Sequence, residues 1–186
     1  TALRKSSRLL LFLLLVTVAG AVAAEESKAR IDATRSGARF SFVIRLEEAP
    51  VDAIVSALHD GMRSEVEYRV QLYRRTGGLP GLFGDRLVEE YETRYIAYFD
   101  PFTRSYRIDA SGSFKPDTRS FEDTDAFLEA FLSVQSRPVK LPVKREKYWL
   151  RGRSILKPVR TAPPLGLMGL FLPSERHRTS WSTAEF

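Results

Sequence analysis

The segment KYWLRGRSILK (residues 147–157) alternates apolar residues with an aromatic residue and cations. A period of two is typical of a β-strand with one buried face. We expect the buried face to consist of Tyr148, Leu150 and Leu156, and the opposite face to carry Trp149, Arg151, Arg153 and Lys157. An exposed Trp beside three cations suits an anionic surface such as phospholipid headgroups, an acidic glycan or an acidic protein. In the alternative interpretation a helix buries Trp149 and the cations only line its rim.

The charge of the chain is concentrated around this segment. Residues 137–160 contain nine basic residues and one acidic residue, a net charge of +8, which leaves −5 for the rest of residues 25–186. This asymmetry indicates a basic face toward an anionic partner, although lysines that protect a sheet edge produce the same pattern. We therefore predict binding of an anionic envelope component, an acidic protein domain or a membrane surface by the following residues: Lys140, Lys144, Arg145, Lys147, Trp149, Arg151, Arg153 and Lys157.

Nucleic acid is not an expected partner. The formal charge of the whole chain is +6, and without residues 1–24 it falls to +3, from 26 basic and 23 acidic residues. Domains that bind nucleic acid are usually far more basic than this.

Acid–base chemistry has one candidate, the carboxylates of Glu89, Glu90 and Glu92. Glu90 and Glu92 share a strand face, and hydrolysis of a glycan needs two carboxyl groups at a defined separation. An envelope hydrolase is therefore the alternative function, although neighbouring glutamates more often lie on a solvated face. The sequence from Ser154 to Lys157 matches S-x-x-K, but in a strand the two side chains point to opposite faces, so we reject that motif.

No metal, cofactor or thiol chemistry is expected. The chain has no cysteine, and its two histidines, His59 and His177, have no ligand spacing with each other. His59 falls near the end of an expected helix, where a solvated or dipole-stabilised histidine is the usual case. We predict no catalytic residue, no metal ligand and no cofactor.

The N-terminal segment has the pattern of a secretory signal peptide. Arg4, Lys5 and Arg8 precede an apolar run, and a small-residue site follows at Ala21-Val22-Ala23. The apolar run is shorter than the ~20 residues of a membrane-spanning helix. We expect residues 1–24 to be a signal peptide that exports the chain to the periplasm, with an uncleaved anchor in the inner membrane as the alternative, and residues 25–186 to form a single β-rich domain.

The elements that would position these residues are mainly strands. Period-two alternation predicts strands over residues 30–39, 38–46, 63–75 and 147–156, with a turn at Ser36-Gly37. Two helices are expected, over 48–61 and over 120–134, the second capped by Ser120. No βαβ repeat is visible, so we predict an antiparallel β-sandwich of about eight strands with two covering α-helices.

The aromatic-rich stretch YETRYIAYFDPFTRSYRI (91–108) is predicted to be a hairpin with most of its rings in the core. Asp100-Pro101 favours a type I turn over residues 100–103. That turn sets the following cross-strand pairs: Phe99 with Arg104, Ala97 with Tyr106, Tyr95 with Ile108, and Arg94 with Asp109.

Two apolar loops, residues 79–83 and 165–172, would form a hydrophobic lip if they met in space. A carrier of an apolar ligand between the sheets is therefore a further alternative. Ordinary packing of the two loops explains the same residues.

The order of these segments resembles domain-of-unknown-function family 4390, a group of bacterial proteins that begin with a signal or anchor segment. The resemblance rests on VDAIVSALHDGMRSEVEYRVQLYRR, RYIAYFDPFTRSYRI, SFEDTDAFLEAFLSV, KYWLRGRSIL and the final Ser180 and Trp181. The chain departs from the family in having Pro163-Pro164-Leu165 where L-P-x-P-L is usual, and in a first loop richer in glycine. The resemblance implies an accessory or sensing role in the envelope and supplies no catalytic residue.

Overall fold

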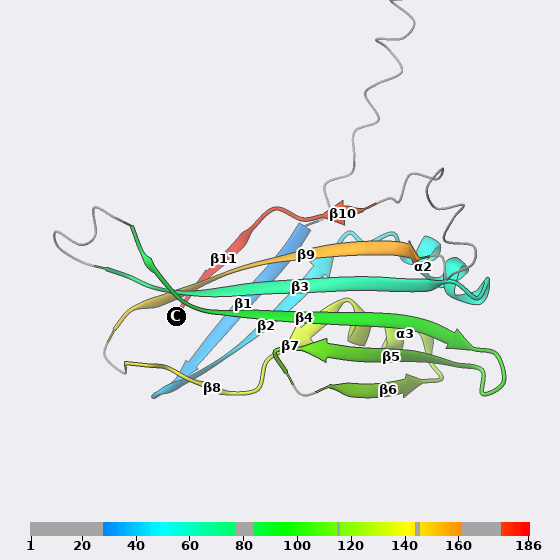
Figure 1. Ribbon diagram of the computed structural model, residues 1–186, viewed down its shortest axis with the longest axis horizontal. Helices are drawn as coiled ribbons and strands as arrows, with labels where there is room; N and C mark the ends of the chain where they lie inside the picture. The colour runs from blue at the N-terminus through cyan, green and yellow to red at the C-terminus, as the bar shows by residue number, and fades with distance from the viewer. Residues whose placement is uncertain (1–27, 77–83, 115, 144–145, 161–175) are drawn as a thin grey trace, which may run out of the picture.

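The computed structural model describes residues 28–76, 84–114, 116–143, 146–160 and 176–186 (Figure 1). These residues form strands and two helices. The strands are β1 (Lys28–Ser36), β2 (Arg39–Glu47), β3 (Arg63–Arg74), β4 (Arg86–Asp100), β5 (Ser105–Gly112), β6 (Asp117–Phe121), β7 (Ser133–Gln135), β8 (Val139–Lys140), β9 (Tyr148–Arg160), β10 (His177–Arg178) and β11 (Ser182–Glu185). The helices are α2 (Val51–His59) and α3 (Thr124–Phe131).

The strands form two antiparallel sheets, which confirms the predicted mainly-β architecture. The small sheet has the order β1-β2-β7, with β8 pairing with the same strand β2. The large sheet has the order β10-β9-β3-β4-β5-β6, with β11 pairing with β9. Figure 1 shows the long strands β9, β3 and β4 running side by side while β1 and β2 cross behind them. We call the face of the large sheet that packs on β1 and β2 its inner face, and the opposite one its outer face.

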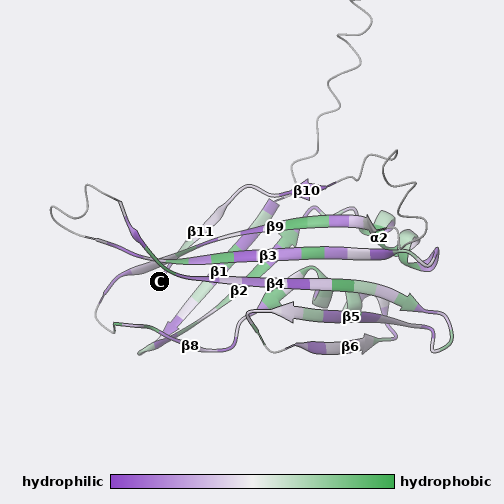
Figure 2. Ribbon diagram, viewed as in Figure 1, coloured by the Kyte–Doolittle hydropathy of each residue, from purple (hydrophilic) through white to green (hydrophobic). Residues whose placement is uncertain are grey.

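The alternation in the sequence determines which side chains enter the space between the sheets. Along β3 the inner side chains Val66, Tyr68, Val70 and Leu72 are all buried, and Figure 2 shows the same alternation of hydrophobic and hydrophilic residues. The sheets approach closely at Gly152 of β9. A Cβ atom there would lie 2.8 Å from the end of the Ile44 side chain, so glycine leaves the room that this side chain occupies.

The two helices cover the parts of the inner face that the small sheet leaves open. The ring of Phe127 on α3 stacks on Tyr106 of β5 at 4.6 Å between ring centroids. The sequence was misleading about the start of this helix. Ser120 lies in β6, and the helix is capped by Asp123, whose Oδ1 accepts the N–H of Ala126 at 2.8 Å.

The β4–β5 hairpin forms, but its predicted register is wrong by two residues. The last strand pair before the turn is Asp100 with Ser105, so the observed pairs are Phe99 with Tyr106, Ala97 with Ile108 and Tyr95 with Ala110. The carboxylate of Asp100 accepts the N–H of Phe102 at 3.0 Å while Asp100 remains in the strand. Arg104 then closes the turn with a φ of 51°. A shift of two residues in the register keeps every side chain on its expected face, so the prediction that most of the rings lie in the core is unaffected.

Three regions of the sequence prediction lie outside the described residues: the predicted signal peptide 1–24 and the apolar loops 79–83 and 165–172. Within the part of the chain that the structure describes, neither helix has the length and apolar character needed to cross a membrane.

Candidate functional site

Four of the predicted binding residues share the outer face of β9. Trp149, Arg151, Arg153 and Lys157 alternate with inward residues that are buried, as the sequence predicted. The register places this face beside the outer residues of β3, because Arg151 lies opposite Gln71 and Arg153 opposite Arg69. The predicted role of these side chains in binding stays a prediction.

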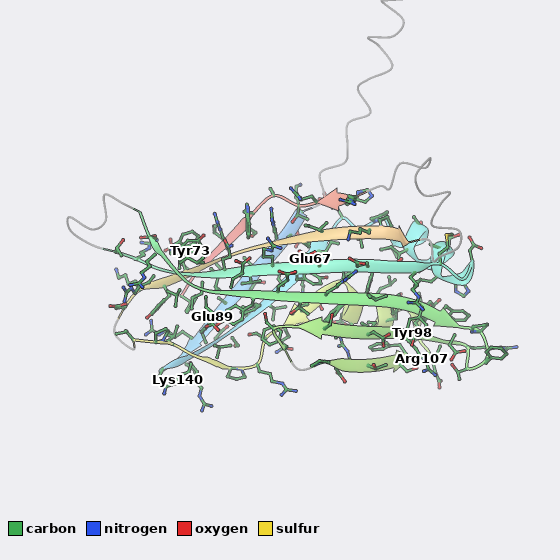
Figure 3. All side chains as sticks on the ribbon, in the orientation of Figure 1. Glu67, Tyr73, Glu89, Tyr98, Arg107 and Lys140 are labelled. Atoms are coloured by element: carbon green, nitrogen blue, oxygen red, sulfur yellow. The ribbon has the colours of Figure 1, made fainter. Side chains whose placement is uncertain are left out.

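The other predicted binding residues are not brought to this face. Lys140 lies on β8, in the small sheet, where it pairs with Arg39 of β2. Figure 3 shows Lys140 at the far edge of the molecule from Glu67 on β3. Lys147 is exposed just before β9, and Lys144 and Arg145 lie outside the described residues.

Lys157 is engaged by a buried carboxylate. Its Nζ lies 2.8 Å from Oε1 of Glu65, whose side chain is only 2% exposed, and Arg94 contacts the other oxygen at 2.6 Å. Burial by itself raises the pKa of Glu65, but the hydrogen bonds from Arg94 and Lys157 and their charges outweigh it, so the pKa is lowered. Glu65 lies on the outer face of β3, and its burial there is a finding of the structure.

Trp149 is neither an open platform nor buried under a helix. Its ring stacks on Tyr73 of β3 with 4.5 Å between centroids and 13° between planes. Its Nε1 donates a hydrogen bond to Asp85 Oδ2 at 2.7 Å. Both the stacking face and the polar edge of this indole therefore already have partners within the chain.

A group of arginines without carboxylate partners among the described residues lies one step along β9, although the Nε of Arg151 donates a hydrogen bond to Gln71 Oε1 at 2.7 Å. The guanidinium carbons of Arg151 and Arg153 lie 4.5 and 4.6 Å from the ring centre of Trp181, which precedes β11. Arg178 on β10 pairs opposite Ile155 and so shares the outer face. We call the group formed by Arg151, Arg153, Arg178 and Trp181 the arginine patch.

Charge compensation is weak in the arginine patch. Within the described ranges, no carboxylate lies within 4.0 Å of the guanidinium groups of Arg151, Arg153 or Arg178. Desolvation first, and then the charges of Arg178 and Arg69, lower the pKa of Arg153, while the charge of the nearby Glu67 carboxylate acts in the opposite direction. The Nε of Arg153 is buried without a hydrogen-bond partner in the described part of the chain, and the same holds for the Nε of Arg69, Arg94 and Arg107, so this feature alone does not distinguish the patch. A guanidinium in this position is stabilised by any anion that reaches it.

The neighbouring Arg69, on the same face, differs from these arginines because carboxylates neutralise its charge. Its guanidinium lies 3.3 Å from each of three carboxylates, those of Glu67, Glu90 and Glu92. The outer face therefore has an acidic stripe on β3 and β4 beside a basic region on β9 and β10. The basic region, and not the face as a whole, is suited to an anionic partner.

The candidate carboxylates for hydrolysis are divided between two faces. Glu90 and Glu92 share the outer face, as predicted, and both contact Arg69. Glu89 points to the inner face, where its Oε2 accepts a hydrogen bond from the Tyr91 hydroxyl at 2.7 Å. The three residues therefore do not converge on one substrate position.

The remaining candidates are structural. Ser154 is fully buried, and its N–H donates to the hydroxyl of Thr179 at 2.9 Å. His59 has its Nε2 2.8 Å from the Tyr106 hydroxyl. Among the described residues, histidines and acidic side chains do not gather into any group that could hold a metal ion.

Arg178 and Trp181 were missed by sequence reasoning. Alternation within a segment does not show which strand that segment pairs with. The structure pairs both β10 and β11 with the edge of β9, and this brings Arg178 and Trp181 to Arg153.

Comparison with known proteins yields one finding. The sequence model of a family described as a domain of unknown function (DUF4390) matches residues 21–185. No curated protein and no solved structure matches the chain.

Proposed function

The chain belongs to the DUF4390 family, and from its sequence and structure we propose that it is an exported, non-enzymatic accessory domain of the cell envelope that binds an anionic partner through the arginine patch. The signal-peptide pattern of residues 1–24 supports export to the periplasm. Residues 25–186 would be the single domain that acts there.

The proposal rests on the electrostatic surroundings of the Arg153 guanidinium. Its guanidinium is partly desolvated, lies near three other arginines (Arg178, Arg69 and Arg151), and forms no ion pair among the described residues, although the charge of Glu67 acts on it from beyond ion-pair distance. Arg69, one strand away, has three carboxylates within ion-pair distance. The arginines of the patch therefore have fewer neutralising contacts than Arg69, and an external anion would supply further ones.

The chemistry of the patch selects oxyanions. The planar guanidinium fork matches the geometry of phosphate and carboxylate groups better than a lysine ammonium does. Trp181 holds the guanidinium groups of Arg151 and Arg153 by cation–π contacts and so limits the conformational entropy that is lost on binding. Binding of this kind weakens as salt concentration rises.

We expect the double charge reversal Arg151→Glu/Arg153→Glu to weaken salt-sensitive binding to vesicles of phosphatidylglycerol and phosphatidylcholine by about tenfold, which corresponds to ~1.4 kcal/mol. The measurement is co-sedimentation of the protein recovered from the periplasm, at low and high salt. Vesicles of phosphatidylcholine alone provide the background.

The matched control is Arg39→Glu/Lys140→Glu. It makes the same change in charge at two cations that face each other on the small sheet. Binding that falls equally in both double variants would show a non-specific response to net charge. Unchanged binding by the β9 variant, to vesicles and to acidic proteins of the envelope alike, would eliminate the proposal.

A further inference from the structure

The inner face of the large sheet carries a cleft that the arginine patch does not use. It lies where β4, β5 and β6 pass β7 of the small sheet (Figure 1), and its volume is about 160 Å³. Its lining consists of Thr93, Tyr95, Ala110, Ser111, Phe114, Asp117, Arg119, Gln135 and Arg137. A cavity of ~150 Å³ accommodates benzene, so this space suits a molecule of about that size and not a drug-sized ligand.

One wall of the cleft is fixed by a glycine turn. Gly112 has a φ of 120°, and the chain then folds back so that the N–H of Ser113 donates to the Glu92 carbonyl at 2.7 Å. This return places the ring of Phe114 parallel to Tyr91, with 6° between the ring planes. The apolar wall formed by Phe114 is therefore held by backbone contacts and does not have to be formed by a ligand.

The opposite wall is fixed by Ser136. Its Oγ accepts the N–H of Phe42 at 2.8 Å, and its own N–H donates to the Phe42 carbonyl at 2.9 Å. These two bonds anchor the end of β7, so that Gln135 and Arg137 on either side of Ser136 line the cleft. The backbone of both walls is thus fixed before a ligand binds, which lowers the entropic cost of binding.

The polar groups of the cleft favour a small anion. The guanidinium of Arg119 lies 5.3 Å from the ring centre of Tyr95, and its Nε is 3.9 Å from the carboxylate of Asp117, at the limit of an ion pair. Arg137 has no carboxylate within 4.0 Å in the described part of the chain. Two guanidinium groups and one carboxylate, that of the mostly exposed lining residue Asp117, leave an excess of one positive charge at this place.

We propose that this cleft binds a small organic carboxylate. Arg119 and Arg137 hold the carboxylate group, the hydroxyl of Thr93 and the amide of Gln135 are available as hydrogen-bond donors, and the apolar part of the ligand lies against Phe114 and Ala110. The apolar wall is what distinguishes this ligand class from an inorganic anion. The site lies on the face of the large sheet opposite the arginine patch, and so its occupancy does not depend on the function proposed above.

The test is titration of the full chain with sodium benzoate, followed by calorimetry and by NMR shifts. We expect a dissociation constant on the order of 1 mM, as suits a ligand of this size. Arg119→Gln and Arg137→Gln should each weaken benzoate binding by about tenfold. Arg63→Gln should leave it unchanged, because Arg63 lies at a similar distance over a tyrosine ring, 5.7 Å from Tyr98, but on the outer face.

Several results would overturn this assignment: benzoate binding that does not saturate, an equal loss in Arg63→Gln, or inorganic phosphate that binds as tightly as benzoate. A loss of benzoate binding in Arg151→Glu/Arg153→Glu with none in Arg137→Gln would place the ligand at the arginine patch and would also exclude the cleft. Arg137 is exposed, so its variant is expected to fold even if Arg119→Gln does not.

Discussion

Replacing Gly112 by alanine is expected to lower the free energy of unfolding by ~3 kcal/mol or more. The φ of 120° at this position belongs to a region that side-chain-bearing residues rarely adopt. A Cβ atom would also lie 2.1 Å from the backbone carbonyl oxygen of Glu92, which accepts the N–H of Ser113 and belongs to a residue paired with Arg69 of β3. For a domain of this size the loss corresponds to a fall in melting temperature of about 6–12 °C.

Gly61→Ala is the matched control for this prediction. Gly61 also has a positive φ, 76°, but an added Cβ meets nothing within 4 Å. Its cost should therefore be that of the backbone conformation alone, ~1–2 kcal/mol. Urea unfolding measures the free energy of unfolding of both variants. Equal losses of stability would show that the contact of the added Cβ with Glu92 does not contribute to the destabilisation. Since Gly112 also directs Phe114 to its place, Gly112→Ala should disturb benzoate binding in the cleft as well.

The sequence predicted the faces of the strands better than their partners. Alternation identified the buried side of β2, β3 and β9, because burial of apolar side chains repeats every two residues. The register of the β4–β5 hairpin could not be read in the same way. The register depends on Asp100 being part of the strand and on the positive φ of Arg104. The sequence pattern of a type I turn predicts neither of these two features.

The candidate site shows the same limit at longer range. The alternation of β9 alone placed Arg151 and Arg153 on the correct face. It did not reveal that the charge of Lys157 is neutralised by a carboxylate. Its partner Glu65 lies 92 residues away, and the alternation along β3 does not show that this outer-face residue is buried. Trp181 joined the site only through the pairing of the C-terminal strands with β9. Contacts between distant segments decide which charges on this face remain free.

Glu65→Gln is expected to lower the free energy of unfolding by about 2–3 kcal/mol at pH 7. The substitution keeps the shape of the side chain but leaves Arg94 and Lys157 without the charge that both now contact. Breaking a fully buried pair costs ~3–5 kcal/mol. The expected loss is smaller here because the Arg94 and Lys157 side chains are 40% and 29% exposed and remain partly solvated.

The effect of pH separates this charge effect from a loss of packing. The pKa of Glu65 in the folded protein is lowered from its ordinary value of 4.5, so the ionised carboxylate contributes its full stability above that value. The contribution is lost as the pH falls through the lowered pKa. The difference between wild type and Glu65→Gln should therefore be greatest near neutral pH and shrink below about pH 4.5.

Glu48→Gln is the control for an exposed pair. Glu48 lies 3.4 Å from Lys28, and both side chains are more than half exposed, so removal of the charge should change stability by no more than ~0.5 kcal/mol. Denaturant unfolding at a series of pH values gives the stability curves of the wild type, Glu65→Gln and Glu48→Gln.

A loss of stability in Glu65→Gln that is independent of pH would mean that Glu65 stabilises the sheet by its shape and hydrogen bonds. Lys157 would then not be held by charge, and it would have to be counted among the cations available to an anionic partner on the outer face.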